Sequence, residues 1–225
     1  GELAAGVAHE INNPINGVIN YAQLILNKAI ADSREQELSK RIIKESERIA
    51  TIVRELLYFA REESEEISRI TIRAALDEAL ALLQHRMNKQ GVILRIKLPD
   101  NLPMIESRSH QVQRLFLNLI NNAIYALMEK YPDADPDKIL EISGELRQKK
   151  QQLMVRVVFR DHGIGIPEEL LERVVNPFVT TKPSGEGTGL GLSISYEIVQ
   201  KHKGALTIDS VVGEYTEVVV ELPAT

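Results

Sequence analysis

The chain has no cysteine and no tryptophan, and aromatic residues make up only 4% of its 225 residues. The lack of cysteine excludes disulfides and thiolate metal sites, and it fits a reducing cytoplasm. No apolar run approaches the roughly 20 residues of a membrane span, and no signal peptide is present. Apolar residues form 44% of the sequence, enough to bury a core. We expect a soluble, cytoplasmic chain without membrane contact.

Charge and motif content argue against nucleic-acid binding, against the common nucleotide-binding loops and against a zinc site. The formal net charge is −5 with both signs mixed along the chain, so the sequence offers no basic face for nucleic acid. Neither a Walker loop nor a dinucleotide fingerprint occurs. Four histidines, His85, His110, His162 and His202, lack the spacing of a zinc site. Because the chain begins at Gly1 within a helical pattern, we expect an upstream sensor or membrane region that this sequence lacks.

The first 63 residues predict two long helices, over 3–30 and 35–63, joined by the polar connection 31–36. Ser33 or Asp32 can cap the second helix. Two broad apolar stripes on that helix would leave half of a lone hairpin's apolar surface in water. The sequence therefore predicts a homodimeric four-helix bundle. The first helix has its apolar stripe at Leu3, Val7, Ile11, Ile15, Val18, Ala22 and Ile25, and the second at Leu38, Ile42, Ile49, Ile52, Leu56 and Phe59, beside a further stripe of Ile43, Val53 and Leu57.

A second, polar stripe on the first helix carries His9, Asn13, Asn16 and Asn20. A lone histidine is more often a solvated or structural residue than a reactive one, but this one lies away from the buried stripe. Pro14 removes one hydrogen bond inside the helix and costs roughly 3 kcal/mol relative to alanine. Its place beside an exposed His-Glu pair suggests that the local geometry serves a purpose.

The charged run 61–69 lacks apolar periodicity and predicts a linker, so we place domains at 1–65 and 66–225. After it, the patterns predict helices over 73–89 and 109–130, with strands at 70–72, 92–98, 139–147 and 153–160. A helix after the glycine-rich stretch and a hairpin of strands 205–210 and 215–222 complete the chain. The fold class expected is a helical hairpin followed by an α+β two-layer sandwich, with a mixed sheet and helices on one face.

The stretch from Asp161 to Ser195 reads DHGIGIPEELLERVVNPFVTTKPSGEGTGLGLSIS and has the features of a nucleotide pocket. Glycines let backbone amides approach phosphate oxygens, and the helix that follows adds free N–H donors at the positive end of its dipole. Either glycine cluster alone is more typical of tight turns. The two together favour an anion site.

Two amides on the helix LFLNLINNAIYAL, Asn118 and Asn122, are four residues apart and project from one face. They are either a buried hydrogen-bonded pair or part of a magnesium site. A cation that already carries nucleotide phosphates can accept a neutral amide oxygen as a ligand.

Five segments resemble the H, N, G1, F and G2 boxes of bacterial sensor histidine kinases, in the family's order, and the resemblance covers essentially the whole chain. Those with a nitrogen-regulation-like HExxNP signature are the most similar in style. The family implies a dimerisation and phosphotransfer hairpin followed by an ATP-binding domain of the GHKL ATPase type. The segments are HEINNP at 9–14, NLINNA at 118–123, DHGIGIP at 161–167, PFVTTK at 177–182 and GTGLGLS at 187–193.

The resemblance implies catalytic roles for the H box. His9 would attack the γ-phosphate of ATP through a ring nitrogen, and Glu10 would hydrogen-bond the other nitrogen. Asn13 matches the position that orients water in the reverse, phosphatase reaction. The phosphoryl group would pass to an aspartate of a response-regulator receiver domain, which we expect to dock near Asn16, Ile19, Asn20 and residues 55–59.

The resemblance also implies ATP and Mg²⁺ as cofactors. Asn122 would coordinate Mg²⁺ with support from Asn118, and Asp161 would accept a hydrogen bond from the adenine amino group. Lys182 would contact the γ-phosphate, and residues 173–187 would form a lid. The remaining nucleotide-binding residues expected are Gly163, Gly165, Thr181, Gly187, Thr188, Gly189, Leu190 and Gly191.

Two departures from the family pattern carry expectations. His162 stands where asparagine is common, which could alter nucleotide affinity, and residues 215–217 replace small residues and threonine. Two other functions stay open: a clamp ATPase of the gyrase type, and a dimerising scaffold with a degenerate pocket. Clamp ATPases place a glutamate where this chain has Asn118, and an amide cannot take a proton from water, so hydrolysis is disfavoured.

Overall fold

The computed structural model describes residues 2–61, 66–149, 151–183 and 187–225. The chain forms two compact units, which are treated separately below: one contains the N-terminal hairpin, and the other comprises Glu66–Val179 and Gly191–Thr225. Within the described residues, no helix is long and apolar enough to cross a membrane.

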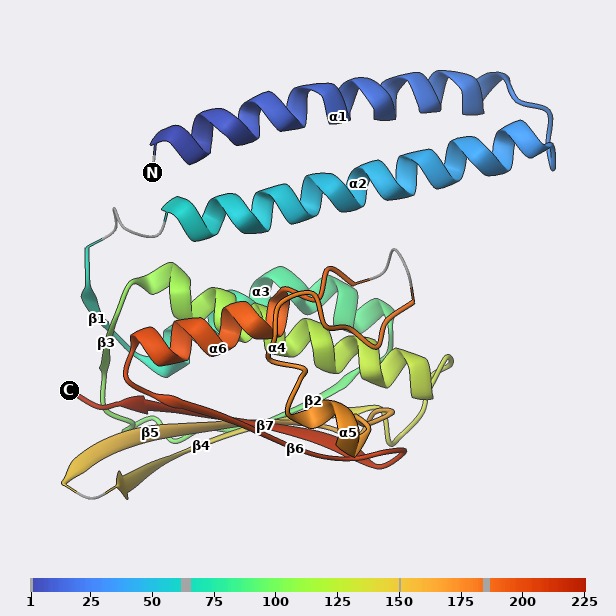
Figure 1. Ribbon diagram of the computed structural model, residues 1–225. Coiled ribbons are helices and arrows are strands. Elements are labelled where there is room, and N and C mark those ends of the chain that lie inside the picture. The colour runs from blue at the N-terminus through green and yellow to red at the C-terminus, as the bar shows by residue number, and fades with distance from the viewer. Residues whose placement is uncertain (1, 62–65, 150, 184–186) are drawn as a thin grey trace. The chain divides into compact units, whose positions relative to one another are not determined.

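The hairpin consists of helices α1 (Glu2–Lys28) and α2 (Arg34–Arg61), close to the predicted ranges (Figure 1). α1 continues through Pro14. The turn between them caps α2, because the Gln36 N–H donates to Ser33 Oγ at 3.2 Å while Gln36 Oε1 accepts from the Asp32 N–H at 3.1 Å. Ser33 is therefore the cap, and Asp32 takes a positive φ of 58° in the turn.

The buried face of α2 is not the stripe with the largest apolar residues. Small side chains and Val53 form the contact with α1, where Ile15, Ala50 and Val53 make a core that Ile19 extends. Small residues allow the two helices to approach closely, and the described residues of the larger stripe, Leu38, Ile42 and Ile49, are exposed. Several large apolar side chains of the hairpin remain exposed in the single chain: Ile11, Val18, Tyr21, Leu24, Ile25, Leu38, Ile42 and Ile49.

The second unit is built on a five-stranded mixed sheet in the order β2-β4-β5-β7-β6. β2 pairs with β4 in parallel, and the other three pairs are antiparallel. The strands are β2 (Ile93–Lys97), β4 (Ile139–Lys149), β5 (Gln152–Asp161), β6 (Ala205–Val211) and β7 (Tyr215–Pro223).

Three helices cover one face of this sheet, and the other face is open, as predicted (Figure 1). They are α3 (Ile72–Lys89), α4 (Ser109–Lys130) and α6 (Gly191–Lys201), and a four-residue helix α5 (Glu168–Leu171) contacts β6. Alternate residues of β4, β5 and β7 face the helices, so Phe159 packs on Phe116 with ring centroids 5.2 Å apart. The predicted α+β sandwich is confirmed.

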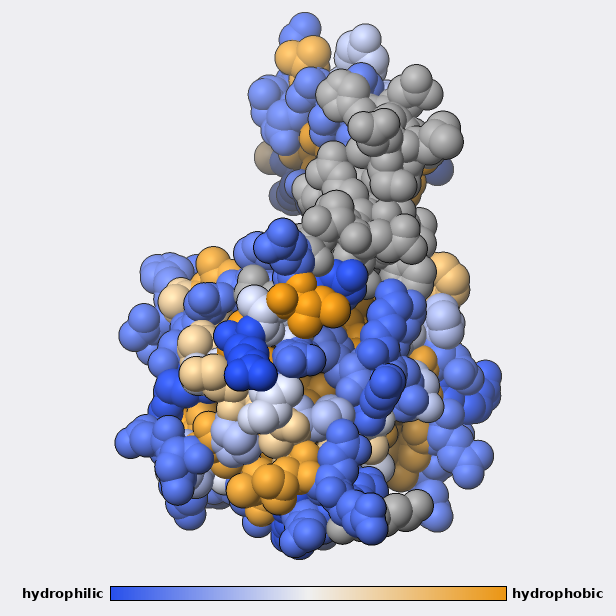
Figure 2. Space-filling model, turned by 90° about the vertical axis from the view of Figure 1, so that its left-hand side faces the viewer, coloured by the Kyte–Doolittle hydropathy of each residue, from blue (hydrophilic) through white to orange (hydrophobic). Residues whose placement is uncertain are grey.

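A second, two-stranded sheet pairs β1 (Ser68–Ile70) with β3 (Ile105–Ser107). The sequence patterns place a strand at 70–72 and none at 105–107, so the first position is wrong by two residues and the second strand is missed. Three-residue strands are too short to show the alternation on which such predictions depend. The side of the unit that carries this small sheet mixes apolar and polar side chains on its surface (Figure 2).

Candidate nucleotide-binding site

The end of β5 places a buried carboxyl on the helix-covered side of the sheet. Asp161 is 6% exposed and pairs in register with Leu140 on β4 and Thr216 on β7. Burial raises the pKa of Asp161 from its ordinary 3.8 to about 7, against the opposing effects of the Gly163 N–H and of Lys130. The Gly163 N–H donates to Asp161 Oδ1 at 3.0 Å. Near neutral pH this carboxyl therefore exists in both protonation states.

The loop after Asp161 is held so closely that only glycine fits at two positions. A Cβ on Gly163 would lie 2.6 Å from the backbone of Ala126, and one on Gly165 would lie 2.3 Å from Val211 O. Gly165 also has a φ of +70°, which favours glycine. These contacts fix the loop between α4 and the β6–β7 turn. The two glycines therefore form a tight turn, and such a turn is compatible with a role in ligand binding.

One face of α4 connects the parts of the site. Its residues at intervals of four are Asn118, Asn122, Ala126 and Lys130, which share this face. Ala126 O accepts from the Ile164 N–H at 3.3 Å, and Lys130 Nζ donates to His162 O at 2.9 Å. The same face therefore bears both predicted magnesium residues and the contacts that hold the loop after β5.

Asn118 is bound to the start of α6. Its Nδ2 donates to Gly191 O at 3.0 Å and lies 3.5 Å from Ser195 Oγ, while Ser195 Oγ donates to Gly191 O at 2.8 Å. The side-chain amide therefore fixes where this helix begins. Asn122, one turn further along α4 and half-buried, lies between this contact and the loop after β5. The support of a magnesium ion by Asn118 stays a prediction.

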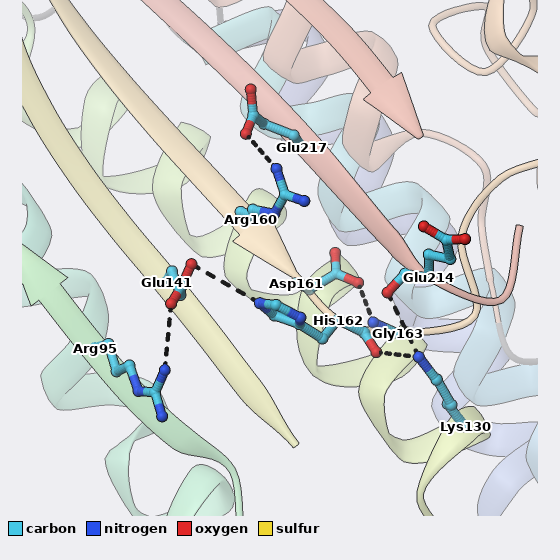
Figure 3. Close-up of polar contacts among 9 residues, drawn as sticks. All are labelled: Arg95, Lys130, Glu141, Arg160, Asp161, His162, Gly163, Glu214 and Glu217. Carbon is cyan, nitrogen blue, oxygen red and sulfur yellow. Dashed lines mark hydrogen bonds and ion pairs between the residues drawn. The ribbon is translucent and has the colours of Figure 1, made fainter. Parts of the chain in front are cut away.

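His162 points away from the site, toward the open face of the sheet (Figure 3). Its Nε2 lies 3.8 Å from Glu141 Oε2, and Glu141 pairs with Arg95 at 3.5 Å. Consecutive residues at a strand's end point to opposite faces, so His162 and Asp161 cannot share one pocket. Any effect of His162 on nucleotide affinity would therefore be indirect, and that effect stays a prediction.

Both halves of the chain match known domain families. Residues 107–225 match the "Histidine kinase-, DNA gyrase B-, and HSP90-like ATPase" family, and residues 1–65 match the "His Kinase A (phospho-acceptor) domain". The chain belongs to the sensor histidine kinase family. The assignment makes the second unit an ATP-binding domain and agrees with the five sequence boxes.

Individual relatives support the assignment over nearly the whole kinase core. Sporulation kinase A of Bacillus subtilis is 33% identical over 211 residues, covering 93% of this chain and 32% of its own length. The sensor histidine kinase ZraS of Escherichia coli K12 is 29% identical over 223 residues, covering 99% of this chain and 45% of its own length. The histidine kinase ThkA, crystallised with the response regulator TrrA, is 25% identical with a TM-score of 0.67, and the match covers 100% of this chain and 62% of ThkA. The chain thus spans 32% of sporulation kinase A and 45% of ZraS, less than half of either.

The structure of the kinase core brings some of the predicted site residues together and leaves others unplaced. Asp161, Gly163 and Gly165 meet α4 and the β6–β7 turn, and Asn118 meets Gly191. Residues 180–190 do not belong to the same compact unit, so their position relative to Asp161 stays a prediction. Residues 184–186 of the lid lie outside the described residues, as do the side chains of His9 and Glu10. The predicted site residues within 180–190, whose position relative to Asp161 stays a prediction, are Thr181, Lys182, Gly187, Thr188, Gly189 and Leu190.

Within the kinase's second unit, two polar residues near the site were missed by sequence reasoning. Thr216 is buried opposite Asp161, and Ser210 Oγ lies 3.1 Å from its hydroxyl while accepting from the Ile166 N–H at 2.8 Å. The predicted pairing of the last hairpin against β5 could have placed Thr216 there. The effect of the departure at residues 215–217 stays a prediction.

Proposed function

We propose that this chain is the catalytic core of a dimeric kinase that transfers the γ-phosphoryl group of Mg-ATP to His9 and then to an aspartate of a response-regulator receiver domain. The observation that carries the proposal is that a phospho-acceptor domain and an ATP-binding domain match one chain, at 1–65 and 107–225. We propose that the boundary between the two units lies at residue 65.

Adenine recognition would centre on Asp161. In its ionised form this buried carboxylate is a strong acceptor for the adenine amino group, and Oδ1 is already oriented by the Gly163 N–H. Thr216 adds a hydroxyl on the neighbouring strand. The glycines Gly163 and Gly165 keep the backbone close without side chains in the way.

Magnesium would enter with the nucleotide. Asn122 supplies a neutral amide oxygen, and most of the remaining ligands would be phosphate oxygens and water, as is typical of Mg²⁺ bound with ATP. Lys182 and the backbone of Gly187, Gly189 and Gly191 would contact the phosphates. The cation would neutralise phosphate charge during transfer.

Transfer to histidine is favoured over hydrolysis by the contacts of Asn118. Its Nδ2 is engaged by Gly191 O, so the residue holds α6 and has no basic group to activate water. In the transfer step, a neutral His9 nitrogen would form the N–P bond as the bond from the γ-phosphorus to the ADP oxygen breaks. Glu10 would accept the hydrogen bond of the other ring nitrogen and balance its developing charge.

Dimerisation through the hairpin is supported by its uncovered apolar residues. Val18, Tyr21 and Leu24 are 45%, 70% and 58% exposed in the single chain, which is costly in water. Asn13, Asn16 and Asn20 are exposed as predicted, and Ile19 packs on the hairpin core. This polar face would receive the receiver domain, with Asn13 orienting water in the reverse reaction. ThkA, a relative of similar fold, was crystallised with a response regulator.

Incubation with γ-labelled ATP and Mg²⁺ tests the proposal. We expect an acid-labile, alkali-stable label on the chain that disappears in His9→Gln and strongly decreases in Asn122→Ala. Free phosphate released at the same rate by His9→Gln would instead indicate a clamp ATPase. Absence of nucleotide binding would indicate a scaffold with a degenerate pocket.

The dimer is tested by sedimentation. Val18→Glu should shift the chain toward monomer, because it places a charge on the exposed apolar face, whereas Lys40→Glu, on an exposed position of α2, should leave the mass unchanged. A wild-type chain that is monomeric at micromolar concentration would contradict the four-helix bundle.

A further inference from the structure

A cavity of about 430 Å³ lies in the second unit, away from the nucleotide site. It is lined by Gln152 at the start of β5, whereas Asp161 ends that strand nine residues later, which corresponds to roughly 30 Å. The first turn of α4, the end of α6 and the end of β7 form its walls, on the face shown in Figure 2. Its volume is within the range of small-molecule sites.

The charged residues of this cavity are mainly positive. Arg108, Lys201 and Lys203 line it together with the acidic side chain of Glu106, and Lys201 also pairs with Glu197 at 3.1 Å, although the whole chain has a net charge of −5. Concentrating basic groups around a cavity raises the local concentration of anions. The charge therefore favours an anionic ligand.

The start of α4 offers uncapped donors to such a ligand. α4 has 22 residues, and its N-cap, Arg108, makes no side-chain cap hydrogen bond. Gln111, in the first turn, lines the cavity and is only 3% exposed, and its Nε2 has no hydrogen-bond partner among the described residues. A buried amide without a partner is costly unless a ligand supplies the acceptor.

His202 fixes the wall opposite α4. Its Nδ1 lies 2.7 Å from Ile198 O and its Nε2 lies 2.7 Å from Ser107 Oγ, while Ser107 Oγ donates to Arg108 O at 2.9 Å. Through Ser107 these contacts connect the end of α6 to the residue that precedes α4, so they hold this wall of the cavity in place.

We propose that this cavity binds a small organic anion, a carboxylate or phosphate monoester with a compact apolar body. The anionic group would lie at the first turn of α4, within reach of Gln111 and Arg108. The apolar body would cover Ile105 and Leu222, which line the same cavity, together with the 64% exposed Ile67.

NMR titration of the whole 225-residue chain with benzoate and with phenyl phosphate tests the site. We expect saturable shifts of the backbone amides of residues 109–111 and of the Gln111 side chain, below about 10 mM. The probe that saturates at the lower concentration identifies the preferred anionic group. Lack of saturation with both probes, or shifts confined to the loop after Asp161, would overturn the proposal.

A glutamine pair provides the matched variants. Gln111→Met should weaken binding about tenfold, as expected for a lost hydrogen bond to a charged group, whereas Gln84→Met, at an exposed position of α3, should not. Because Gln111→Met removes a buried unpartnered amide, it should also keep or raise the melting temperature. Unchanged affinity in Gln111→Met would refute the role of the amide, and a lower melting temperature would show that the amide has a partner in the protein.

Discussion

Asp161 should lower the stability of the nucleotide-free protein at neutral and alkaline pH. Its carboxyl has an ordinary pKa of 3.8 when unfolded and about 7 when folded, because burial disfavours the charge. A raised pKa in the folded state stabilises the protein fully below pH 3.8, and this contribution is lost as the pH rises through 7. Each pH unit between the two values changes the free energy of unfolding by about 1.4 kcal/mol, so the loss reaches about 4 kcal/mol by pH 8.

The variant Asp161→Asn isolates this contribution. A carboxamide has the shape of the protonated carboxyl, and its oxygen can still accept from the Gly163 N–H, but it does not titrate. Below about pH 4 the variant and the wild type should therefore be equally stable. The variant should become progressively more stable than the wild type as the pH rises, by about 4 kcal/mol at pH 8.

Hydrogen exchange of β5 and α4 amides gives the required free energies, because these elements open only when the second unit unfolds. The measurement separates this unit from the hairpin, which a single melting temperature would not do. Exchange is compared between variant and wild type at each pH, so the intrinsic pH dependence cancels. A stability difference that does not vary with pH, or a variant less stable than the wild type at pH 8, would show that the carboxyl is solvated or paired.

Three further changes test the same geometry. ATP should bind about tenfold more tightly to the ionised Asp161, so its Kd should fall between pH 6 and 8 and be independent of pH in Asp161→Asn, as measured by calorimetry. Gly165→Ala should destabilise the second unit by more than about 2 kcal/mol in urea unfolding, because the added Cβ collides with Val211 O and the residue has a positive φ. Gly213→Ala is the control: its φ is +78° but the space around it is open, so it should cost only about 1 kcal/mol. Lys138→Met should cost about 1 to 3 kcal/mol in the same assay, because the fully buried Lys138 Nζ donates to two backbone carbonyls.

Much of the fold could be predicted because long elements repeat their pattern many times. The 27-residue α1 and the 22-residue α4 contain several turns of apolar periodicity, and β4 and β5 alternate over ten residues or more. β1 and β3 contain three residues each and show no period. Hydrophobicity also does not reveal which stripe of α2 is buried, since small residues such as Ser46 and Ala50 are buried there.

The site was predictable to the extent that its chemistry shows in residue types. Asn118 and the glycines were identified from their spacing, and Asp161 from the resemblance to histidine kinases. The bond from Asn118 to the start of α6 spans 73 residues and depends on tertiary contact. The orientation of His162 could have been found by continuing the alternation of β5 one residue further. Lys138 gave no signal at all, because a lysine in an acidic loop resembles a solvated surface residue.

Three buried polar groups of the second unit differ in how completely they are hydrogen-bonded. Lys138 is completely buried, yet its contacts with two carbonyls explain it as a clamp for the loop before β4. Asp161 has one backbone donor and a strongly raised pKa, and Gln111 Nε2 has no partner among the described residues. Selection for stability alone would replace both with apolar residues, so a ligand that completes their hydrogen bonds is the physical reason for each to stay polar. Asp161 and Gln111 each lie at one of the two ligand sites proposed above, at opposite ends of β5.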